Sequence, residues 1–396
     1  AAYTVREALD VAAANLEQET FEDPEIEAEL RELIGSTYRG LSLPDVAVPH
    51  LQRAVSLWRE LGESKVRRAT ETSLDLVVAL REQGQVADAE ELVEALHADF
   101  AQAIGDQDSL YWTIQHNRAY IMRHRGRLRD AEALFREVLA AREQLLGVDA
   151  ESTIATMHNL GTLMIGLREP EQARQVLAEA VVRAKRSDHP ASLTLQIVDN
   201  LAEAWRDLGK LEEAAACHRE SMAGFEALVG PDDQLTIGCG YHLLKVLHRQ
   251  GKRDELETLA TELLARCERT FGPDDYRTLD VLQALAAAVS GRGDVQRAAT
   301  LMQRAFDGVV KDRGEVHPET FNTGHNLTMA RIAANDQKGA LAITKHLVDL
   351  LAREPDPALQ LPKTFPGLTW LLRARVLQMA GETVAAKSAG GNAKRL

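Results

Sequence analysis

Apolar residues along this chain recur at intervals of three and four, the spacing that places them on one face of an α-helix. The segment after Gly126 is typical, with apolar positions at Leu128, Ala131, Leu134, Phe135, Val138 and Leu139. Short segments such as Gly230-Pro231-Asp232-Asp233 separate these stretches and supply helix breakers and capping residues. The pattern predicts amphipathic helices joined by short turns.

The helical segments repeat with a fixed period. Full copies of the pattern G-x-x-x-x-A lie at Gly84/Ala89, Gly126/Ala131, Gly209/Ala214 and Gly293/Ala298. Degenerate copies lie at Ser42/Ala47, Arg168/Ala173, Gly251/Leu256, Asn335/Ala340 and Gly381/Ala386. We call the first residue of each copy the anchor. The first eight anchors are 42 residues apart, except for one step of 41.

The two ends of this pattern have separate physical roles. The anchor ends one helix in the left-handed conformation, which glycine and asparagine adopt at low cost. The small residue lets the next helix approach closely. The sequence therefore predicts an all-α, right-handed solenoid of about nine helix pairs. WD40 propellers and HEAT arrays have similar periods, but propeller blades need alternating strands and HEAT units lack this turn.

The repeat also predicts how the chain is divided. We expect an N-terminal capping helix over residues 1–27 and repeats one to eight over 28–353. A proline-containing loop over 354–367 lengthens the last anchor step to 46 residues. Residues 368–396 then form a partial last repeat or a C-terminal cap.

Composition narrows the setting of the protein. Apolar residues make up 45% of the 396 and aromatic residues only 5%, as in soluble helical proteins. The chain has no apolar run of membrane-spanning length and no export signal. Cys217, Cys239 and Cys267 are an odd number of cysteines in helical sequence, so we expect reduced thiols and a cytoplasmic location. A net charge of -14 disfavours nucleic acid and anionic membrane as partners.

Three segments of the chain resemble the tetratricopeptide repeat (TPR) of the kinesin-light-chain type. That unit reads G-x-x-H-P-x-T, then L-x-N-L-A, then G-x-x-x-x-A. Its elements appear here as His317-Pro318-Glu319-Thr320 with Asn326-Leu327, as Asn200-Leu201-Ala202, and as Asn159-Leu160-Gly161. The resemblance implies helix pairs whose first helices line a concave, ligand-binding face.

A narrower resemblance concerns the N-terminus. Thr4–Asp10 (TVREALD), Asp23–Ala28 (DPEIEA) and Ile34–Tyr38 (IGSTY) resemble the segment that opens the C-terminal TPR region of bacterial serine/threonine protein kinases. The chain does not begin with methionine and starts inside an expected helix, as a piece of a longer protein would.

Catalytic motifs do not occur in these residues. We find no kinase loops, G-x-S-x-G elbow, H-E-x-x-H helix or phosphate-binding loop, so we expect neither an enzyme nor a cofactor. Cys239 and His242 have a C-x-x-H spacing, with Cys217, His218 and Cys267 as further candidates, but zinc sites normally need a second paired spacing. We therefore predict no metal site. The repeated His116, His158 and His325 indicate a shared environment, because successive repeats lie about 10 Å apart.

Two columns of side chains on the expected first helices are candidates for ligand binding. Nine residues before an anchor stand Asn117, Asn159, Asn200 and Asn326, and three before stand Arg39, Arg81, Arg123, Arg206 and His248. Tyr120, Tyr241 and Lys245 lie close to these columns in sequence. In the family this asparagine contacts the backbone of a bound peptide, and guanidinium groups favour carboxylates and phosphates. Alternatively, the asparagines bridge adjacent helices and the arginines neutralise nearby glutamates.

These observations predict a scaffold that binds a peptide or protein segment, acidic or phosphorylated, in a groove. The leading context is the regulatory TPR region of a bacterial serine/threonine kinase. A free-standing adaptor, the sensor half of a TPR-plus-protease protein and a self-associating array remain open.

Overall fold

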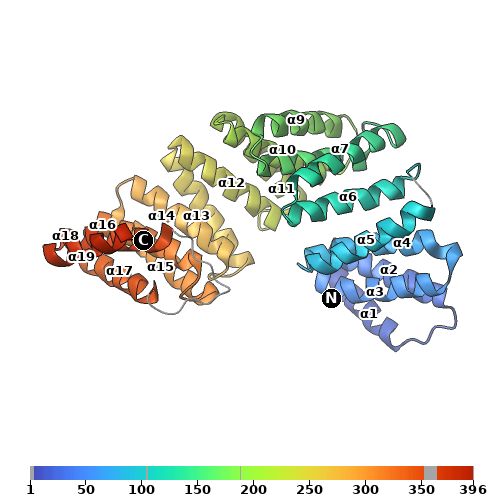
Figure 1. Ribbon diagram of the computed structural model, residues 1–396, viewed down its shortest axis with the longest axis horizontal. Coiled ribbons are helices and arrows are strands. Elements are labelled where there is room, and N and C mark those ends of the chain that lie inside the picture. The colour runs from blue at the N-terminus through green and yellow to red at the C-terminus, as the bar shows by residue number, and fades with distance from the viewer. Residues whose placement is uncertain (1–3, 104–105, 188, 352–363, 396) are drawn as a thin grey trace. The chain divides into compact units, whose positions relative to one another are not determined.

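The computed structural model describes residues 4–103, 106–187, 189–351 and 364–395. In this part of the chain the regular secondary structure consists of helices and includes no strand (Figure 1). The chain divides into two compact units, residues 1–200 and 201–396. None of the helices in the described residues is both long and apolar enough to cross a bilayer.

The helices of the first unit begin and end close to the expected turns. They are α1 (Val5–Gln18), α2 (Pro24–Gly40), α3 (Pro44–Glu60), α4 (Val66–Glu82), α5 (Val86–Ala103), α6 (Ser109–His124), α7 (Leu128–Leu145), α8 (Glu151–Gly166) and α9 (Pro170–Arg186). A short 3-10 helix, η1 (Glu63–Lys65), precedes α4. The unit boundary falls within α10 (Ala191–Asp207).

The second unit continues the same alternation. Its helices are α11 (Leu211–Val229), α12 (Gln234–Gln250), α13 (Arg253–Thr270), α14 (Tyr276–Gly291), α15 (Val295–Arg313), α16 (Pro318–Ala333), α17 (Gln337–Leu351), α18 (Thr364–Met379) and α19 (Thr383–Arg395). Residues 354–363 of the predicted loop over 354–367 lie outside the described residues, and residues 364–367 belong to α18 instead of the loop. Over the described ranges, nine helix pairs follow α1, so the predicted all-α repeat fold is confirmed.

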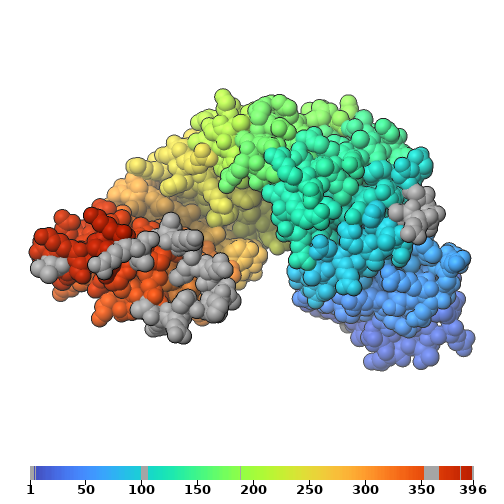
Figure 2. Space-filling model, in the orientation of Figure 1, coloured from blue at the N-terminus to red at the C-terminus, as the bar shows by residue number. Residues whose placement is uncertain are grey.

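Neighbouring pairs stack through their first helices. In the first unit α2 contacts α4, α4 contacts α6 and α6 contacts α8, and in the second unit α12 contacts α14. Side chains fill the spaces between the ribbons of successive pairs within each unit (Figure 2). Trp58, Tyr38, Phe135, Phe225 and Phe321 are among the largest fully buried side chains. Each unit therefore has a core that runs from pair to pair, as expected for stacked repeats.

The anchors adopt the backbone conformation that the repeat predicted. The φ angle is positive at all nine, including the non-glycine anchors Ser42 (58°), Arg168 (63°) and Asn335 (58°). At Gly84 the turn is a Schellman motif, because Gly84 donates to the Arg81 carbonyl at 3.0 Å and Gln85 donates to the Leu80 carbonyl at 2.8 Å. The small residue five positions later is fully buried at Ala131 and Ala214.

A second recurrent contact fixes the turn between one pair and the next. The hydroxyls of Thr153, Thr236, Thr278 and Thr320 donate to the glycine carbonyl six residues earlier, at 2.6–2.9 Å. All four threonine side chains are buried. These bonds explain the threonine of the H-P-x-T motif. Each one satisfies a carbonyl of the turn and holds the first helix of the following pair against that turn.

Capping residues start the first two helices. The Thr4 hydroxyl accepts a hydrogen bond from the Glu7 backbone, and Glu7 accepts one from the Thr4 backbone, a capping box. The Asp23 carboxylate caps α2 by accepting from the Glu25 N–H at 2.9 Å. Asp10 of α1 accepts a hydrogen bond from the buried Tyr38 of α2 at 2.8 Å, which ties α1 to the first pair.

Candidate functional site

Four of the predicted ligand-binding residues meet in the first unit, at α4 and α6. The Arg81 guanidinium carbon lies 3.5 Å from the centroid of the Tyr120 ring, and that of Arg123 lies 5.3 Å from the same ring. Arg81 also donates to the Asn117 side-chain oxygen at 3.0 Å. The His124 ring stacks on Tyr120 with centroids 4.8 Å apart. We call these five residues the cationic cluster.

The cationic cluster concentrates positive charge around one aromatic ring. Burial lowers the pKa of Arg81, and the nearby Arg123 lowers it further. Burial and both arginines lower the pKa of His124. An anion bound here would offset the repulsion between the guanidinium groups and accept charge-assisted hydrogen bonds.

Arg39, predicted for the same column, has a different environment. It forms an ion pair with Asp75 of α4 at 3.2 Å, and Ser36 donates to the same carboxylate at 2.9 Å. Its charge is therefore offset by a contact between the first two repeats.

Members of the asparagine column in the first unit bridge adjacent repeats. The Asn159 amide nitrogen lies 3.0 Å from His116 Nε2, and that of Asn200 lies 2.6 Å from His158 Nε2. We call these two contacts the Asn–His ladder. Asn117 is buried and donates to the Thr113 carbonyl at 3.0 Å. Asn326 is exposed on α16.

The histidines of the ladder are held in the neutral form. Burial lowers the pKa of His116 well below its usual value and that of His158 to about 4. Arg142, itself buried, reaches His116 Nδ1 at 3.4 Å and donates to Thr156 and to the Ser152 carbonyl, both at 2.8 Å. His325 instead contacts Thr369 of α18 at 2.8 Å. A neutral imidazole can accept the asparagine N–H at Nε2, which an imidazolium cannot.

The other predicted residues meet in the second unit, around a cavity of about 530 Å³. Arg206, Tyr241, Lys245 and His248 line it, from α10 and α12. The remaining lining residues include Leu244, Arg249, Asp280, Gln283, Ala284, Ala287, Glu319 and Asn322. We call this cavity the second-unit pocket. It lies beside α14, where Ala284 and Ala287, nine and six residues before the anchor, have short side chains that leave it open.

Polar contacts cross the second-unit pocket. The Lys245 ammonium lies 4.2 Å from the centroid of the Tyr241 ring, and the Tyr241 hydroxyl donates to Asp280 at 2.9 Å. Burial and the nearby Glu319 raise the pKa of Asp280.

Arg206 forms the wall of the pocket at α10. It pairs with Glu203 at 2.5 Å and with Asp207 at 3.0 Å, and its carbonyl accepts from Arg249 at 3.0 Å. Arg206 is therefore neutralised, as Arg39 is.

The sequence columns missed the acidic side of this pocket. Asp280 stands 13 residues before its anchor and Glu319 stands 16 before its own, whereas the two columns used positions nine and three. The residues that line the pocket stand at different distances from the anchor in successive repeats. No single position of the repeat therefore contains all of them. A search along diagonals of the repeat would have found both carboxylates.

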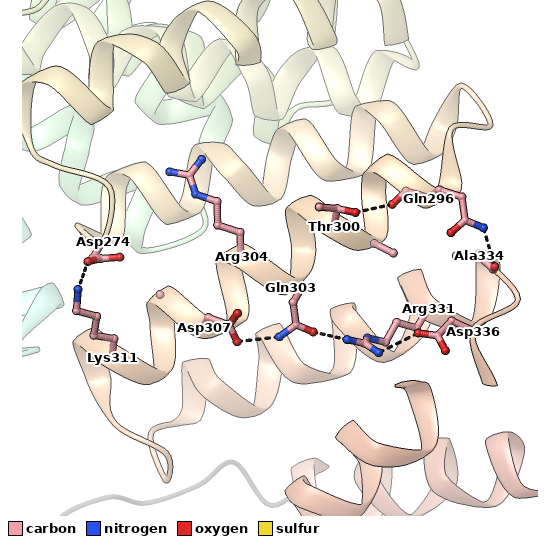
Figure 3. Close-up of a pocket in the computed structure, with 12 residues that line it drawn as sticks. Asp274, Gln296, Thr300, Gln303, Arg304, Asp307, Lys311, Arg331, Ala334 and Asp336 are labelled. Carbon is pink, nitrogen blue, oxygen red and sulfur yellow. Dashed lines mark hydrogen bonds and ion pairs between the residues drawn. The ribbon is translucent and has the colours of Figure 1, made fainter. Parts of the chain in front are cut away.

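A further cavity of about 560 Å³ lies along α15 (Figure 3). Its polar groups are engaged with one another: Gln303 donates to Asp307 at 2.7 Å and accepts from Arg331 at 2.5 Å, and Arg331 also pairs with Asp336 at 2.9 Å. Lys311 pairs with Asp274 at the other end. It contains none of the predicted binding residues, so we place the candidate site elsewhere.

The cysteines are placed in helix contacts. Cys239 and Cys267 are buried, and burial raises the pKa of the Cys267 thiol to about 11. Among the described residues, none of the three cysteines joins a group of three or more side chains that could hold a metal ion, but the other two candidates, His218 and His242, belong to such a group, with ring centroids 5.5 Å apart. The prediction of no metal site therefore stays a prediction.

Sequence comparison finds tetratricopeptide repeats within the chain. Models of this repeat match residues 113–186 and 238–309, and a second model of it matches 194–235. A comparison with curated proteins finds no match.

Solved structures share the fold. One is a signal transduction ATPase with numerous domains and a tetratricopeptide repeat sensor, from Pyrococcus horikoshii (13% identity, TM-score 0.66, 92% of this chain and 52% of that one). Another is the apo quorum sensor NprR from B. thuringiensis (13% identity, TM-score 0.62, covering 87% and 93%). BtubC (BKLC) from P. vanneervenii is 19% identical, with a TM-score of 0.50 over 59% of this chain and 96% of that one.

The left-handed anchors, the buried small residues and the stacked first helices define a helical-repeat protein. The matched models show tetratricopeptide repeats over residues 113–186, 194–235 and 238–309, and the predicted tetratricopeptide-repeat fold is confirmed. The resemblance of the N-terminus to a kinase TPR region stays a prediction.

Proposed function

We propose that this chain is a protein-interaction scaffold that binds a peptide or protein segment along the first helices of its repeats. The observation that carries this proposal is the second-unit pocket, which gathers Arg206, Tyr241, Lys245 and His248 around one cavity. Two proteins of similar fold bear descriptions as sensors, the P. horikoshii ATPase and NprR. A sensing role for this array is an argument by analogy of fold.

The cationic cluster supports an acidic or phosphorylated ligand in the first unit. Arg81 and Arg123 approach the same ring, although the net charge of the whole chain is -14. Guanidinium groups bind carboxylates and phosphates through paired hydrogen bonds. Nucleic acid, which needs a broad basic surface, fits this charge distribution poorly.

The Asn–His ladder is compatible with contact to a ligand backbone. A carboxamide has two N–H donors and an oxygen acceptor, and the ladder uses the nitrogen of Asn159 and Asn200. We propose that the remaining amide atoms contact a bound backbone, while the ladder fixes the orientation of the side chain.

The proposed context is the regulatory repeat region of a bacterial serine/threonine kinase in the cytoplasm. It is supported by the motifs at Thr4–Asp10, Asp23–Ala28 and Ile34–Tyr38. The capping roles of Thr4 and Asp23 account for part of these motifs without a kinase. A free-standing adaptor, a TPR-plus-protease sensor and a self-associating array are the competing contexts.

Selection of peptides from a random display library on the whole chain tests the binding function. We expect enrichment of acidic or phosphomimetic sequences, and loss of part of that enrichment in a variant with Arg81→Gln and Arg123→Gln. Arg129→Gln is the matched control, because Arg129 is 65% exposed on α7 and pairs with Glu169. A library that shows no enrichment, or enrichment that neither the cluster nor the pocket affects, would reject the proposal.

A further inference from the structure

The two ends of the second-unit pocket carry opposite charge. Lys245, His248 and Arg249 lie in the last two turns of α12. Asp280 lies in α14 and Glu319 in the first turn of α16. The pocket therefore has a basic end, formed by Lys245, His248 and Arg249, and an acidic end, formed by Asp280 and Glu319.

The repeat explains why the charges separate. The residues of the basic end stand two to six positions before their anchor, whereas Asp280 and Glu319 stand 13 and 16 positions before theirs. Equivalent helices of successive repeats run in the same direction, so these positions differ by about 10 to 20 Å along the helix axes at 1.5 Å per residue. An extended chain of about three to six residues covers that length.

Tyr241 contacts both ends of the pocket. The Tyr241 ring lies beneath the Lys245 ammonium, and its hydroxyl is bonded to Asp280. Ala284 and Ala287 leave room along α14 between the two ends. The lining thus offers a path for a short chain segment, with an ammonium over the Tyr241 ring and a carboxylate at the Tyr241 hydroxyl.

Each end has a reason to accept a ligand charge. Burial and the nearby Glu319 raise the pKa of Asp280, whereas Tyr241, Lys245 and Arg313 lower it. A cation bound beside Asp280 and Glu319 would offset the repulsion between the two carboxylates. At the basic end, Arg206 is already neutralised by Glu203 and Asp207, so Lys245, His248 and Arg249 are the groups that would meet an anion.

We propose that the second-unit pocket binds a dipolar peptide segment, with an acidic side chain at Lys245 and Arg249 and a lysine or arginine side chain at Asp280 and Glu319. This rests on the proposed peptide-binding function and specifies its ligand in the second unit. The cationic cluster, by contrast, would take an acidic group alone. The array then selects charge differently in its two units.

Four fluorescent, end-capped hexapeptides test this inference with the whole chain. They share an alanine spacer and differ at two positions, which are acidic and basic, both acidic, both basic, or both glutamine. We expect fluorescence polarisation at low salt to show the dipolar peptide binding at least about tenfold more tightly than the doubly acidic one, because one charge-assisted contact is added.

Two double variants assign the ends. Asp280→Asn with Glu319→Gln should remove the advantage of the dipolar over the doubly acidic peptide, while the new amide oxygen at position 280 can still accept from Tyr241. Lys245→Gln with Arg249→Gln should remove the higher affinity of the dipolar peptide relative to the doubly basic one. Arg304→Gln on α15, outside the second-unit pocket, is the control, and circular dichroism checks that each variant is folded.

Three outcomes would overturn the inference. The dipolar and doubly acidic peptides could bind equally well, or none of the four peptides could bind. The dipolar peptide could also keep its higher affinity in the variant that lacks the Asp280 and Glu319 carboxylates. The library selection separates these from failure of the proposed function. Enrichment of uniformly acidic peptides that depends on Arg81 and Arg123 would leave the scaffold standing and reject only the dipolar ligand.

Discussion

The side-chain nitrogen of Asn159 lies 3.0 Å from Nε2 of His116, which belongs to the preceding repeat. The same contact joins Asn200 to His158 one repeat later. Each link joins residues more than 40 positions apart, so the ladder couples neighbouring repeats through partly buried polar groups. Such groups stabilise a fold only while both partners keep the required protonation state.

The ladder predicts loss of stability in mild acid. A histidine in an unfolded chain titrates near pH 6.5, whereas the pKa of His158 in the fold is about 4. Between these values the unfolded chain binds a proton at His158 that the folded chain does not. The free energy of unfolding is therefore highest above about pH 6.5 and decreases as the pH is lowered toward 4. For His158 the loss is up to about 3 kcal/mol.

Urea unfolding at pH 7.5 and 5.0 measures this dependence. His158→Gln, which stays neutral, should reduce the difference in unfolding free energy between the two pH values. His248→Gln, at an exposed site, is the control and should leave the difference unchanged. Equal pH dependence in the wild type and His158→Gln would contradict the role of His158.

The anchors predict opposite effects of glycine at two equivalent sites. Gly126 has φ 77° and Arg168 has φ 63°. Gly126→Ala should cost about 1 kcal/mol, because alanine is strained in this region, and Arg168→Gly should gain up to about 1 kcal/mol. Urea unfolding measures both. Gly166→Ala, at a helical site with open space around the Cβ, should be neutral or stabilising, and a loss there would show that added bulk explains the first result.

The small buried residue after each anchor predicts a local response. Ala131 has no exposed surface, so Ala131→Arg should destabilise the protein by about 3 kcal/mol or more through overpacking and burial of charge. Hydrogen exchange should show the loss of protection concentrated in α6, α7 and α8. Ala140→Arg, on the exposed face of the same helix, should have little effect. Protection lost evenly across the array would argue against stability that depends on neighbouring repeats.

The arginine column predicts unequal contributions to binding. Arg123→Glu should weaken a selected acidic peptide at least tenfold and reduce the salt dependence of binding, because Arg123 belongs to the cationic cluster. Arg206→Gln should change affinity by less than about threefold, because Glu203 and Asp207 already offset its charge. Isothermal titration calorimetry provides the comparison. An equal loss in both variants would mean that the whole column contacts the ligand.

The 42-residue period predicted the backbone conformation at positions where the residue type alone did not. Arg168 and Ser42 are poor candidates for a left-handed conformation by residue type, yet the 42-residue step placed them at anchors, and both have positive φ. The repeat constrains the backbone of every copy alike because each copy must pack on the next.

The contacts of side chains were harder to predict. Asn117 and Arg81 belong to separate columns of the sequence, and only the stacking of α4 on α6 shows that they bond to each other. Arg39 and Arg81 occupy the same column, but one meets Asp75 and the other meets Tyr120, because the residues of the next repeat differ. The position of a residue in the repeat fixes where its side chain leaves the helix. The residues of the adjacent repeat determine what that side chain contacts.

The alanines beside the second-unit pocket suggest how such an array acquires a new binding specificity. Nine and six residues before the anchor, α14 has Ala284 and Ala287 where α12 has His242 and Lys245. The cavity thus arises from short side chains in one repeat, without an inserted loop or a change of backbone. We expect larger side chains at these two positions of α14 to close the cavity. Such substitutions would change recognition in one repeat while the backbone of the array stays the same.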